Sequence, residues 1–219
     1  MARPTRPALT RAAVLDGAVT LADRDGLAAL SMRSLARHLG VEAMSLYHHV
    51  AHKEALLDGM VDVVFGEIHL PAIGGDWATE LRRRHESARE VLTRHRWAVG
   101  LMDSRSEPGL MTLQHHDAVV GCLRAGGFSV PMAAHAFAVL DAHLYGFLVQ
   151  ELALPFSPGD DLEEMTTAMM ADFPVDALPH LAELATEHVT KPGYAFGDEF
   201  AWGLELILDG LGRRRGDPA

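Results

Sequence analysis

The stretch SMRSLARHLGVEAMSLYHHVAHKEALL, residues 31–57, decides how the N-terminal part of the chain folds. Gly40 can end a short first helix, because glycine readily takes the positive φ that a sharp turn requires. A second helix of about two turns, from near Glu42, places Leu46 and Val50 four residues apart on one face. Two short helices joined by such a turn, after a longer bracing helix, have the dimensions of a helix-turn-helix.

Capping residues and turn signals extend the helical pattern along the chain. Thr10 and Ser31 are suited to cap the first two helices, Lys53 opens a fourth, and Asp76 can cap the next. No convincing strand pattern appears between the later turn signals, so the sequence predicts an all-α fold. Further helices are expected near residues 77–95, 108–125, 130–152, 162–173, 177–189 and 195–214, with a short one near 97–104.

Composition and cysteine content limit the class of protein. A chain of 219 residues, of which 48% are hydrophobic and 22% charged, can bury a sizeable core. Asp141 and His143 interrupt the apolar stretch at 136–149 before it reaches the roughly 20 residues of a membrane span, so no membrane segment is expected. With Cys122 alone no intrachain disulfide can form and, without a secretory signal, we expect a cytoplasmic protein.

The charges are divided unevenly along the chain, whose formal net charge is -11. Residues 1–55 hold seven Lys or Arg against five Asp or Glu, whereas residues 56–219 hold twelve against twenty-five. Four histidines add to the basic part, and histidine gains a proton below a pH of about 6.5. The two parts are therefore expected to meet different partners.

The second short helix carries groups suited to DNA on the face opposite Leu46 and Val50. A hydroxyl, a phenol and an ammonium group can each donate to phosphate, while short or flexible side chains can approach base edges. The alternative is a tight corner between two helices with a solvated polar face and no role in DNA binding. The residues concerned are Ala43, Met44, Ser45, Tyr47, His48 and His49, with Lys53 at the start of the next helix.

The stretch LSMRSLARHLGVEAMSLYHHVAHKEALLDGM, residues 30–60, resembles the DNA-binding domain of the TetR family of transcriptional repressors. The family pattern contains a capping Ser or Thr, an alanine in the second helix, LGV at the turn, an LY pair, and K followed by LL. The resemblance implies that Tyr47 and Lys53 meet phosphates and that Arg33 reaches the backbone or a base.

The resemblance also implies which side chains face the major groove, namely Ala43, Met44, Ser45 and His48. Where the tetracycline repressor has a glutamine and a proline at the start of this helix, the chain has Ala43 and Met44. The operator sequence is therefore expected to differ from that of the tetracycline repressor.

Segments of the acidic part, among them DWATELRRRHESAREVLTRH and FAWGLELILDGL, are similar to the tetracycline-repressor-like C-terminal domain. The resemblance implies a larger helical domain that binds a ligand and forms a homodimer through the helices at 130–152 and 195–214. The alternative is that these apolar helices are the core of a monomer. The expected domains are a flexible basic arm at 1–9, a three-helix helix-turn-helix DNA-binding domain at 10–55, and an effector-binding and dimerisation domain at 56–219.

The function that follows is a repressor that a small apolar ligand releases from a palindromic operator in double-stranded DNA. Methionine and aromatic side chains suit an adaptable apolar pocket, although the same residues can equally form core. By count along the chain, His69 falls where the tetracycline repressor has a histidine that touches its drug. The candidate ligand-binding residues are Phe65, His69, Trp97, Met102, Met111, Met132, Phe137, His143 and Phe147, with Met169 or Met170.

Three other functions are weighed against this one. A metal-responsive regulator would need ligands from the set His115, His116, Asp117, His135, Asp141, His143 and His188, but their spacing matches no metal motif, so neither a metal nor a cofactor is expected. No nucleophile or nucleotide-binding motif indicates an enzyme. A helical ligand-binding or scaffold protein would show no sequence-specific DNA binding.

Overall fold

A computed structural model describes residues 9–102, 104, 105, 107–154, 173–191 and 193–216. The described residues form helices and no strand, which confirms the all-α prediction. Most of the expected helix at 162–173, with Met169 and Met170, and most of the N-terminal arm lie outside these residues. The elements are α1 (Arg11–Asp25), η1 (Leu27–Ala29), α2 (Met32–Leu39), α3 (Ala43–Leu46), α4 (Lys53–Glu67), α5 (Trp77–Arg94), η2 (Arg96–Ala98), α6 (Leu110–Ala125), α7 (Val130–Ala153), α9 (Pro179–Leu184), η3 (Ala185–Val189) and α10 (Asp198–Arg214).

The predicted helix caps are confirmed. Thr10 Oγ1 accepts a hydrogen bond from the Ala13 amide at 3.1 Å, and Asp76 Oδ1 accepts one from the Thr79 amide at 2.9 Å. Ser31 forms a reciprocal capping box with Ser34, in which each side chain bonds the backbone amide of the other residue. Each cap satisfies an amide that the helix itself leaves without a partner, so these helix starts are set locally.

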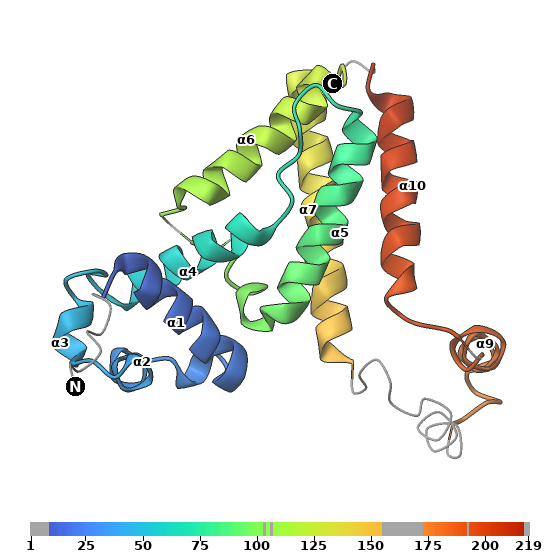
Figure 1. Ribbon diagram of the computed structural model, residues 1–219. Coiled ribbons are helices and arrows are strands. Elements are labelled where there is room, and N and C mark those ends of the chain that lie inside the picture. The colour runs from blue at the N-terminus through green and yellow to red at the C-terminus, as the bar shows by residue number, and fades with distance from the viewer. Residues whose placement is uncertain (1–8, 103, 106, 155–172, 192, 217–219) are drawn as a thin grey trace.

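Two hydrophobic cores organise the molecule, and Figure 1 shows the helices that enclose them on either side of α4. The first core fills the space between α1, α2, α3 and the N-terminal half of α4. Gly17 on α1 allows α2 to come close, because a Cβ at this position would lie 2.6 Å from Leu39 Cδ2. Leu46 and Val50, the two residues expected on the inner face of the second short helix, are both buried in this core.

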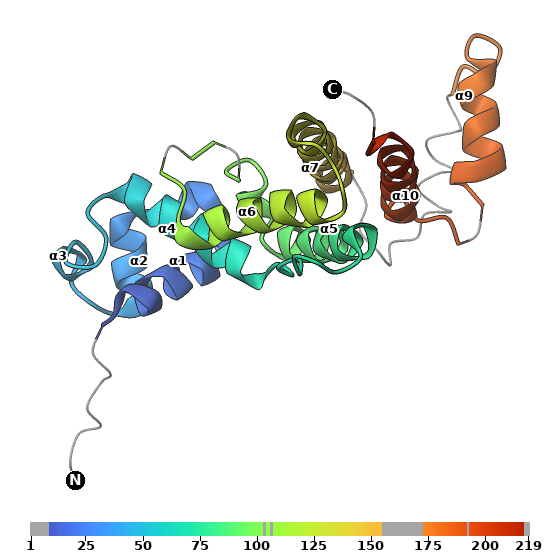
Figure 2. The same cartoon turned by 90° about the horizontal axis from the view of Figure 1, so that it is seen from above.

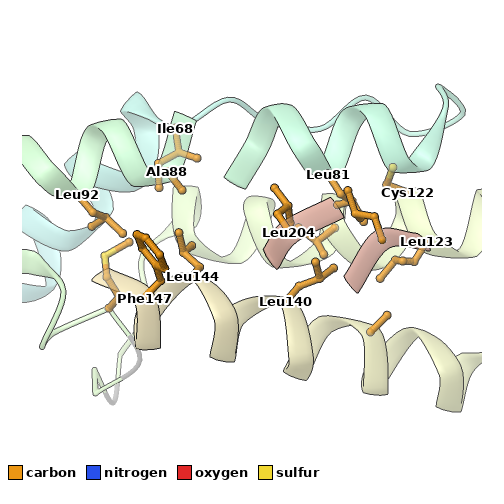
Figure 3. Close-up of a cluster of buried hydrophobic side chains, with 14 of the residues drawn as sticks. Ile68, Leu81, Ala88, Leu92, Cys122, Leu123, Leu140, Leu144, Phe147 and Leu204 are labelled. Carbon is orange, nitrogen blue, oxygen red and sulfur yellow. The ribbon is translucent and has the colours of Figure 1, made fainter. Parts of the chain in front are cut away.

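The second core lies between the C-terminal half of α4 and helices α5, α6, α7 and α10. Figure 3 shows Leu140, Leu144 and Phe147 of α7 facing Leu81 and Leu92 of α5. In both ribbon views α9 lies outside this bundle, beyond α10 (Figures 1 and 2). The larger domain is therefore a helical bundle in which α5 and α7 pack face to face (Figure 3).

Helix α7 is the one helix of the described chain that is long and apolar enough to cross a membrane. Its mean hydropathy is 1.4 over a window of which 44% is buried inside the structure. Asp141 and His143, the polar residues within its apolar stretch, face the protein interior, where they contact Arg84 and the Phe200 carbonyl. A core helix passes the same test of length and composition, and α7 packs between α5, α6 and α10.

Several helix bounds differ from the sequence-based expectation. The helix expected from 108 begins at Leu110, after Pro108 and Gly109, and the helix expected from 195 begins at Asp198. The short helix expected near 97–104 is a single 3₁₀ turn, η2. The segment expected as one helix at 177–189 is divided into the α-helical turns of α9 and a π-helical turn, η3.

We expect Gly40→Ala to lower the free energy of unfolding by about 1–2 kcal/mol, because Gly40 sits at φ 62° and ψ 41°, where a Cβ is strained. Thermal unfolding followed by circular dichroism would measure the change. Gly100→Ala is the matched control, since Gly100 has no positive φ and its added Cβ would meet open space. Equal stability of the Gly40 variant and the control would contradict the role assigned to this turn.

Candidate DNA-binding face and effector domain

The proposed DNA-contacting side chains lie on one outer face of α3 and the turn that follows it. Met44 is 72% exposed and Tyr47 44% exposed, and His48 is also exposed, whereas Leu46 points into the first core. Ala43, Ser45 and His49 are half-buried at the edge of this face. The structure therefore brings together the residues that the sequence placed opposite Leu46 and Val50.

Helix α3 is shorter than the two turns that its sequence predicts. It covers Ala43–Leu46, and Tyr47, His48 and His49 continue as a hydrogen-bonded turn. The His49 amide bonds the Leu46 carbonyl at 2.9 Å, three residues back, while the Val50 amide bonds the same carbonyl at 3.0 Å. This 3₁₀-type bond continues the helical winding beyond Leu46 with a tighter turn. Tyr47 and His48 therefore remain on the outer face although they lie outside the α-helix.

Two cations flank this face without an anionic partner in the part of the chain that the structure describes. Arg33, in the first turn of α2, and Lys53, the first residue of α4, are both exposed, and neither forms an ion pair there. His52 caps α4, since its Nδ1 accepts the Ala55 amide at 3.1 Å. The sequence-based analysis counted His52 only as a basic residue and missed this cap, although its position one residue before the helix was the available signal.

Some of the proposed ligand-binding residues converge around His116, on α6. Phe65 and Phe137 place their ring centroids 5.8 and 5.3 Å from that of His116. His116 and Met102 also line a cavity of about 130 Å³ next to the start of α6. Met111, half-buried, lies against α4 near Gly66, and Met132 is buried at the start of α7.

The other proposed ligand-binding residues lie elsewhere and have protein partners. His69 Nε2 lies 3.0 Å from Glu80 Oε2, and the Trp97 indole donates to Asp23 at 2.7 Å. His143 donates from Nε2 to the Phe200 carbonyl at 3.1 Å, and Phe147 packs against α10 and the segment before it. The structure therefore does not gather the whole set into one chamber.

A polar cluster that the sequence-based analysis did not single out lies in the second core. Arg84 of α5 is fully buried, and its Nη1 donates to Asp141 Oδ1 of α7 at 3.2 Å. His85 Nδ1 donates to the Leu81 carbonyl at 2.6 Å, which leaves Nε2 to accept from Arg84 Nη1 at 3.3 Å. The signal was present in the sequence, because Arg84 recurs at helical spacing with the buried residues Leu81, Ala88, Val91 and Leu92.

Burial holds the two core histidines neutral at pH 7. Desolvation, with the nearby Arg84 charge, lowers the pKa of His85 to about 3. Desolvation, with the charges of Arg84 and His116, lowers the pKa of His115 to about 4. A neutral imidazole offers one donor and one acceptor, so both rings can join polar contacts without adding charge to the core.

Comparison with known proteins matches both domains of the chain. A family model described as "Tetracyclin repressor-like, C-terminal domain" matches residues 70–215. A second, described as "Bacterial regulatory proteins, tetR family", matches residues 14–60, which contain the helix-turn-helix. The chain belongs to the TetR family of transcriptional regulators.

Individual relatives agree with this TetR-family assignment. The chain is 31% identical to the HTH-type transcriptional repressor DrrR1 of Streptomyces coeruleorubidus, over 99% of this chain and 85% of that protein. It is 37% identical to an HTH-type transcriptional regulator of Saccharopolyspora erythraea over 67% of this chain, a match that spans 63% of the relative. Its fold matches that of the TetR-family protein ActR of Streptomyces coelicolor in complex with actinorhodin, with a TM-score of 0.78 and 26% sequence identity. The match covers 96% of this chain and all of the ActR chain.

In this TetR-family regulator, polar contacts fasten the DNA-binding domain to the larger domain. Asp23, near the end of α1, accepts from Trp97 Nε1, and Asp23 Oδ1 lies 2.8 Å from His95 Nδ1. His95 Nε2 lies 3.2 Å from Glu67 Oε2 of α4. Three elements therefore meet at His95, where a change in the larger domain can reach α1 directly.

The histidines named above as possible metal ligands are dispersed. His143 bonds a backbone carbonyl, His188 lies 3.1 Å from Glu199, and His115 packs on Phe65. Across the described ranges, no group of three or more His, Cys, Asp or Glu side chains is arranged to hold a metal ion. The metal-responsive alternative therefore has no support in the geometry.

The buried histidines predict that acid weakens the fold. Below pH 6.5 the unfolded chain binds protons at His85 and His115 that the folded chain takes up only near pH 3 to 4. The free energy of unfolding should therefore decrease as the pH is lowered through this window, by up to about 1.4 kcal/mol per pH unit for each histidine. Urea unfolding at about pH 7, 6 and 5 would measure how the free energy of unfolding changes with pH. The variant His85→Gln should show a smaller change with pH than the parent protein. An equal change in both proteins would show that His85 does not contribute.

Proposed function

We propose that the protein is a homodimeric repressor that binds a palindromic operator and releases it when a small, largely apolar molecule occupies the larger domain. The observation that carries the proposal is the outer face of α3, where Met44, Tyr47 and His48 are exposed beside Arg33 and Lys53. The family assignment adds support, since the relative DrrR1 is named a repressor and ActR was crystallised with actinorhodin. We place the DNA-binding domain at residues 10–55 and the effector-binding and dimerisation domain at 56–219.

The proposed contacts to DNA divide into two kinds. Tyr47, Lys53 and Arg33 would bind the phosphate backbone, because a phenol, an ammonium and a guanidinium group all donate hydrogen bonds to phosphate. The side chains that would enter the major groove and read base edges are Ala43, Met44, Ser45 and His48, with His49 beside them. Phosphate contacts set position and affinity, while base contacts set the preferred sequence.

The proposed dimer uses the outer faces of α7 and α10, which pack against each other in the bundle (Figure 2). Phe200, Leu204, Leu208 and Leu211 turn inward from α10, while Trp202 and Leu206 remain 68% and 60% exposed on its other side. Helix α7 likewise leaves Val139 and Val149 exposed. Large apolar side chains on the outside of two adjacent helices favour burial against a second copy.

Release of DNA would follow from the position of α4. Its N-terminal half packs with α1 in the first core, and Phe65 in its last turns packs on His115 and His116 of α6. A ligand that moves these side chains therefore displaces a helix shared with the DNA-binding domain. A coupling of about 1–3 kcal/mol would change operator affinity about 5- to 150-fold, and operator DNA would weaken ligand binding by the same factor.

We expect Lys53→Ala and Met44→Gln to affect DNA binding in different ways. Lys53→Ala should weaken binding to all duplexes alike and reduce the salt slope of log Kd by about one, as loss of a phosphate contact does. Met44→Gln should instead change which bases are preferred at one position in each half-site. Selection from random duplex DNA, followed by titration of the selected duplex over a range of salt, measures both. The opposite pattern would show that the orientation assigned to α3 is wrong. If the protein selects no preferred sequence from random DNA, the proposed function is overturned.

We expect the protein to sediment as a dimer at micromolar concentration and Trp202→Glu to sediment as a monomer. A carboxylate buried at the interface without a partner costs several kcal/mol, which raises the dimer dissociation constant at least about 100-fold. Leu110→Glu is the matched control, because Leu110 is 67% exposed but lies on α6. A monomeric parent protein, or a dimeric Trp202 variant, would contradict this interface.

A further inference from the structure

Arg84 is a buried cation that the protein satisfies only in part. The side chain is fully buried on α5, and its contacts with Asp141 and His85 both use Nη1. Within the described residues, Nε and Nη2 are buried and have no hydrogen-bond acceptor. A buried donor without an acceptor costs free energy, more so when the group is charged, so this arrangement is expected where another molecule supplies the acceptor.

The two unpaired nitrogens are the pair that binds carboxylates elsewhere in this chain. Arg24 donates from Nε and Nη2 to the two oxygens of Asp25 at 2.8 and 2.7 Å. Arg82 uses the same two nitrogens for Glu205, and Arg89 uses them for Glu151. Nε and Nη2 lie on one edge of the guanidinium plane at the separation of two carboxylate oxygens. Arg84 therefore presents a complete carboxylate-binding edge inside the core.

The surroundings of this edge match an aromatic body attached to the carboxylate. His115 is 1% exposed, and the Arg84 charge and the Phe65 backbone both act on its ring. Neither ring nitrogen makes a hydrogen bond of normal geometry among the described residues. The Phe65 ring lies 5.7 Å from the His115 ring. A ligand there would meet one cationic edge, one neutral imidazole and an aromatic wall.

We propose that the effector is an aromatic carboxylate, and that Arg84 holds its carboxylate through Nε and Nη2 with His115 as a second polar contact. This inference rests on the proposed effector-controlled function and specifies it, because the ligand then combines an apolar ring system with one anionic group. Asp141 keeps its bond to Nη1 and so orients the guanidinium group without occupying the binding edge.

The cavity beside His116 indicates how such a ligand acts on the DNA-binding domain. Its volume of about 130 Å³ is well below the roughly 300–1,000 Å³ of a typical ligand pocket. Arg84 is fully buried and does not line this cavity, so a ring system that reaches it must displace side chains. Phe65 lies in contact with both His115 and His116. Because Phe65 belongs to α4, ligand entry and displacement of α4 are expected to be one event.

The test compares aromatic carboxylic acids with their own primary amides on the full-length protein. Pairs such as naphthoate with naphthamide and biphenylcarboxylate with biphenylcarboxamide share a ring system and differ in charge. We expect acids to raise Tm and to bind at least about 10-fold more tightly than their amides in calorimetric titrations, because the amide lacks the second acceptor and the charge. A panel in which no acid binds, or in which acids and amides bind equally, would overturn the proposal.

Variants of Arg84 then assign the preference to this residue. Arg84→Met should abolish the preference for acids, while Arg84→Lys should keep only part of it, because lysine retains the charge but not the paired donors. Arg83→Met is the control, since Arg83 is the exposed neighbour on the same helix. Full acid preference in a folded Arg84→Met protein would also overturn the proposal. If this variant does not fold, Arg84→Lys and the comparison of acids with amides decide.

A DNA measurement separates this inference from the proposed function. Anisotropy of a labelled duplex, selected from random DNA by the protein, would follow release on addition of each acid and amide. We expect acids to release DNA from the parent protein and from Arg83→Met, and to release much less from Arg84→Lys. Release by amides as effectively as by acids would overturn the inference and leave the repressor standing. Acid binding through Arg84 by a protein that selects no DNA would support the inference and overturn the repressor.

Discussion

The structure depends on α4 belonging to two hydrophobic cores at once. Leu56, Leu57 and Met60 pack into the first core, while Val61, Val64 and Phe65 pack into the second. Trp97 and Leu101, from the segment after α5, also pack against both cores. Because close-packed interiors do not deform continuously, α4 cannot move in one core without disturbing the other. The orientation of the helix-turn-helix is therefore tied to the packing of the larger domain.

The ion pairs of the molecule show which cations are engaged by the protein itself. Arg82, Arg89, Arg94 and Arg105 each donate to a carboxylate of another element. In the described part of the chain, Arg33 and Lys53 have no such partner and lie at the surface beside α3. Arg84 is the buried exception, because among the described residues it is paired through one nitrogen only. Arg33 and Lys53 lie where DNA is proposed to bind, and Arg84 lies where the small anion is proposed to bind.

Local charge also explains how an acidic protein can approach DNA. The two negative charges nearest to Lys53 along α4, Glu54 and Asp58, both pair with Arg105. The Arg105 guanidinium lowers the pKa of Glu54, so that carboxylate stays ionised and its charge is balanced by Arg105. Fields of exposed charges decay within about 10 Å at ordinary salt, so the sign of the local surface matters more than the net charge of the chain.

Local sequence was sufficient for the capped helix starts, the tight turn at Gly40 and the inward face of the second short helix. Caps at Thr10, Ser31 and Asp76 depend on atoms within three residues, and the burial of Leu46 and Val50 follows from helical periodicity. The DNA-facing residues could be proposed from the sequence for the same reason, since they are the complement of that buried face. The ligand-binding set was less predictable, because methionine and aromatic residues form core and pocket alike.

Only the tertiary structure decided which polar side chains are buried and which apolar ones are left outside. Arg84 reads as one of three consecutive arginines, and its burial depends on α7 bringing Asp141 against α5. Trp202 and Leu206 read as further apolar residues of the last helix, and their exposure depends on α5 and α7 covering its opposite side. These outcomes arise from contacts between segments far apart in sequence. Helical spacing can mark the inward face of a helix, but it does not say which distant segment will cover that face or which polar partner it will bring.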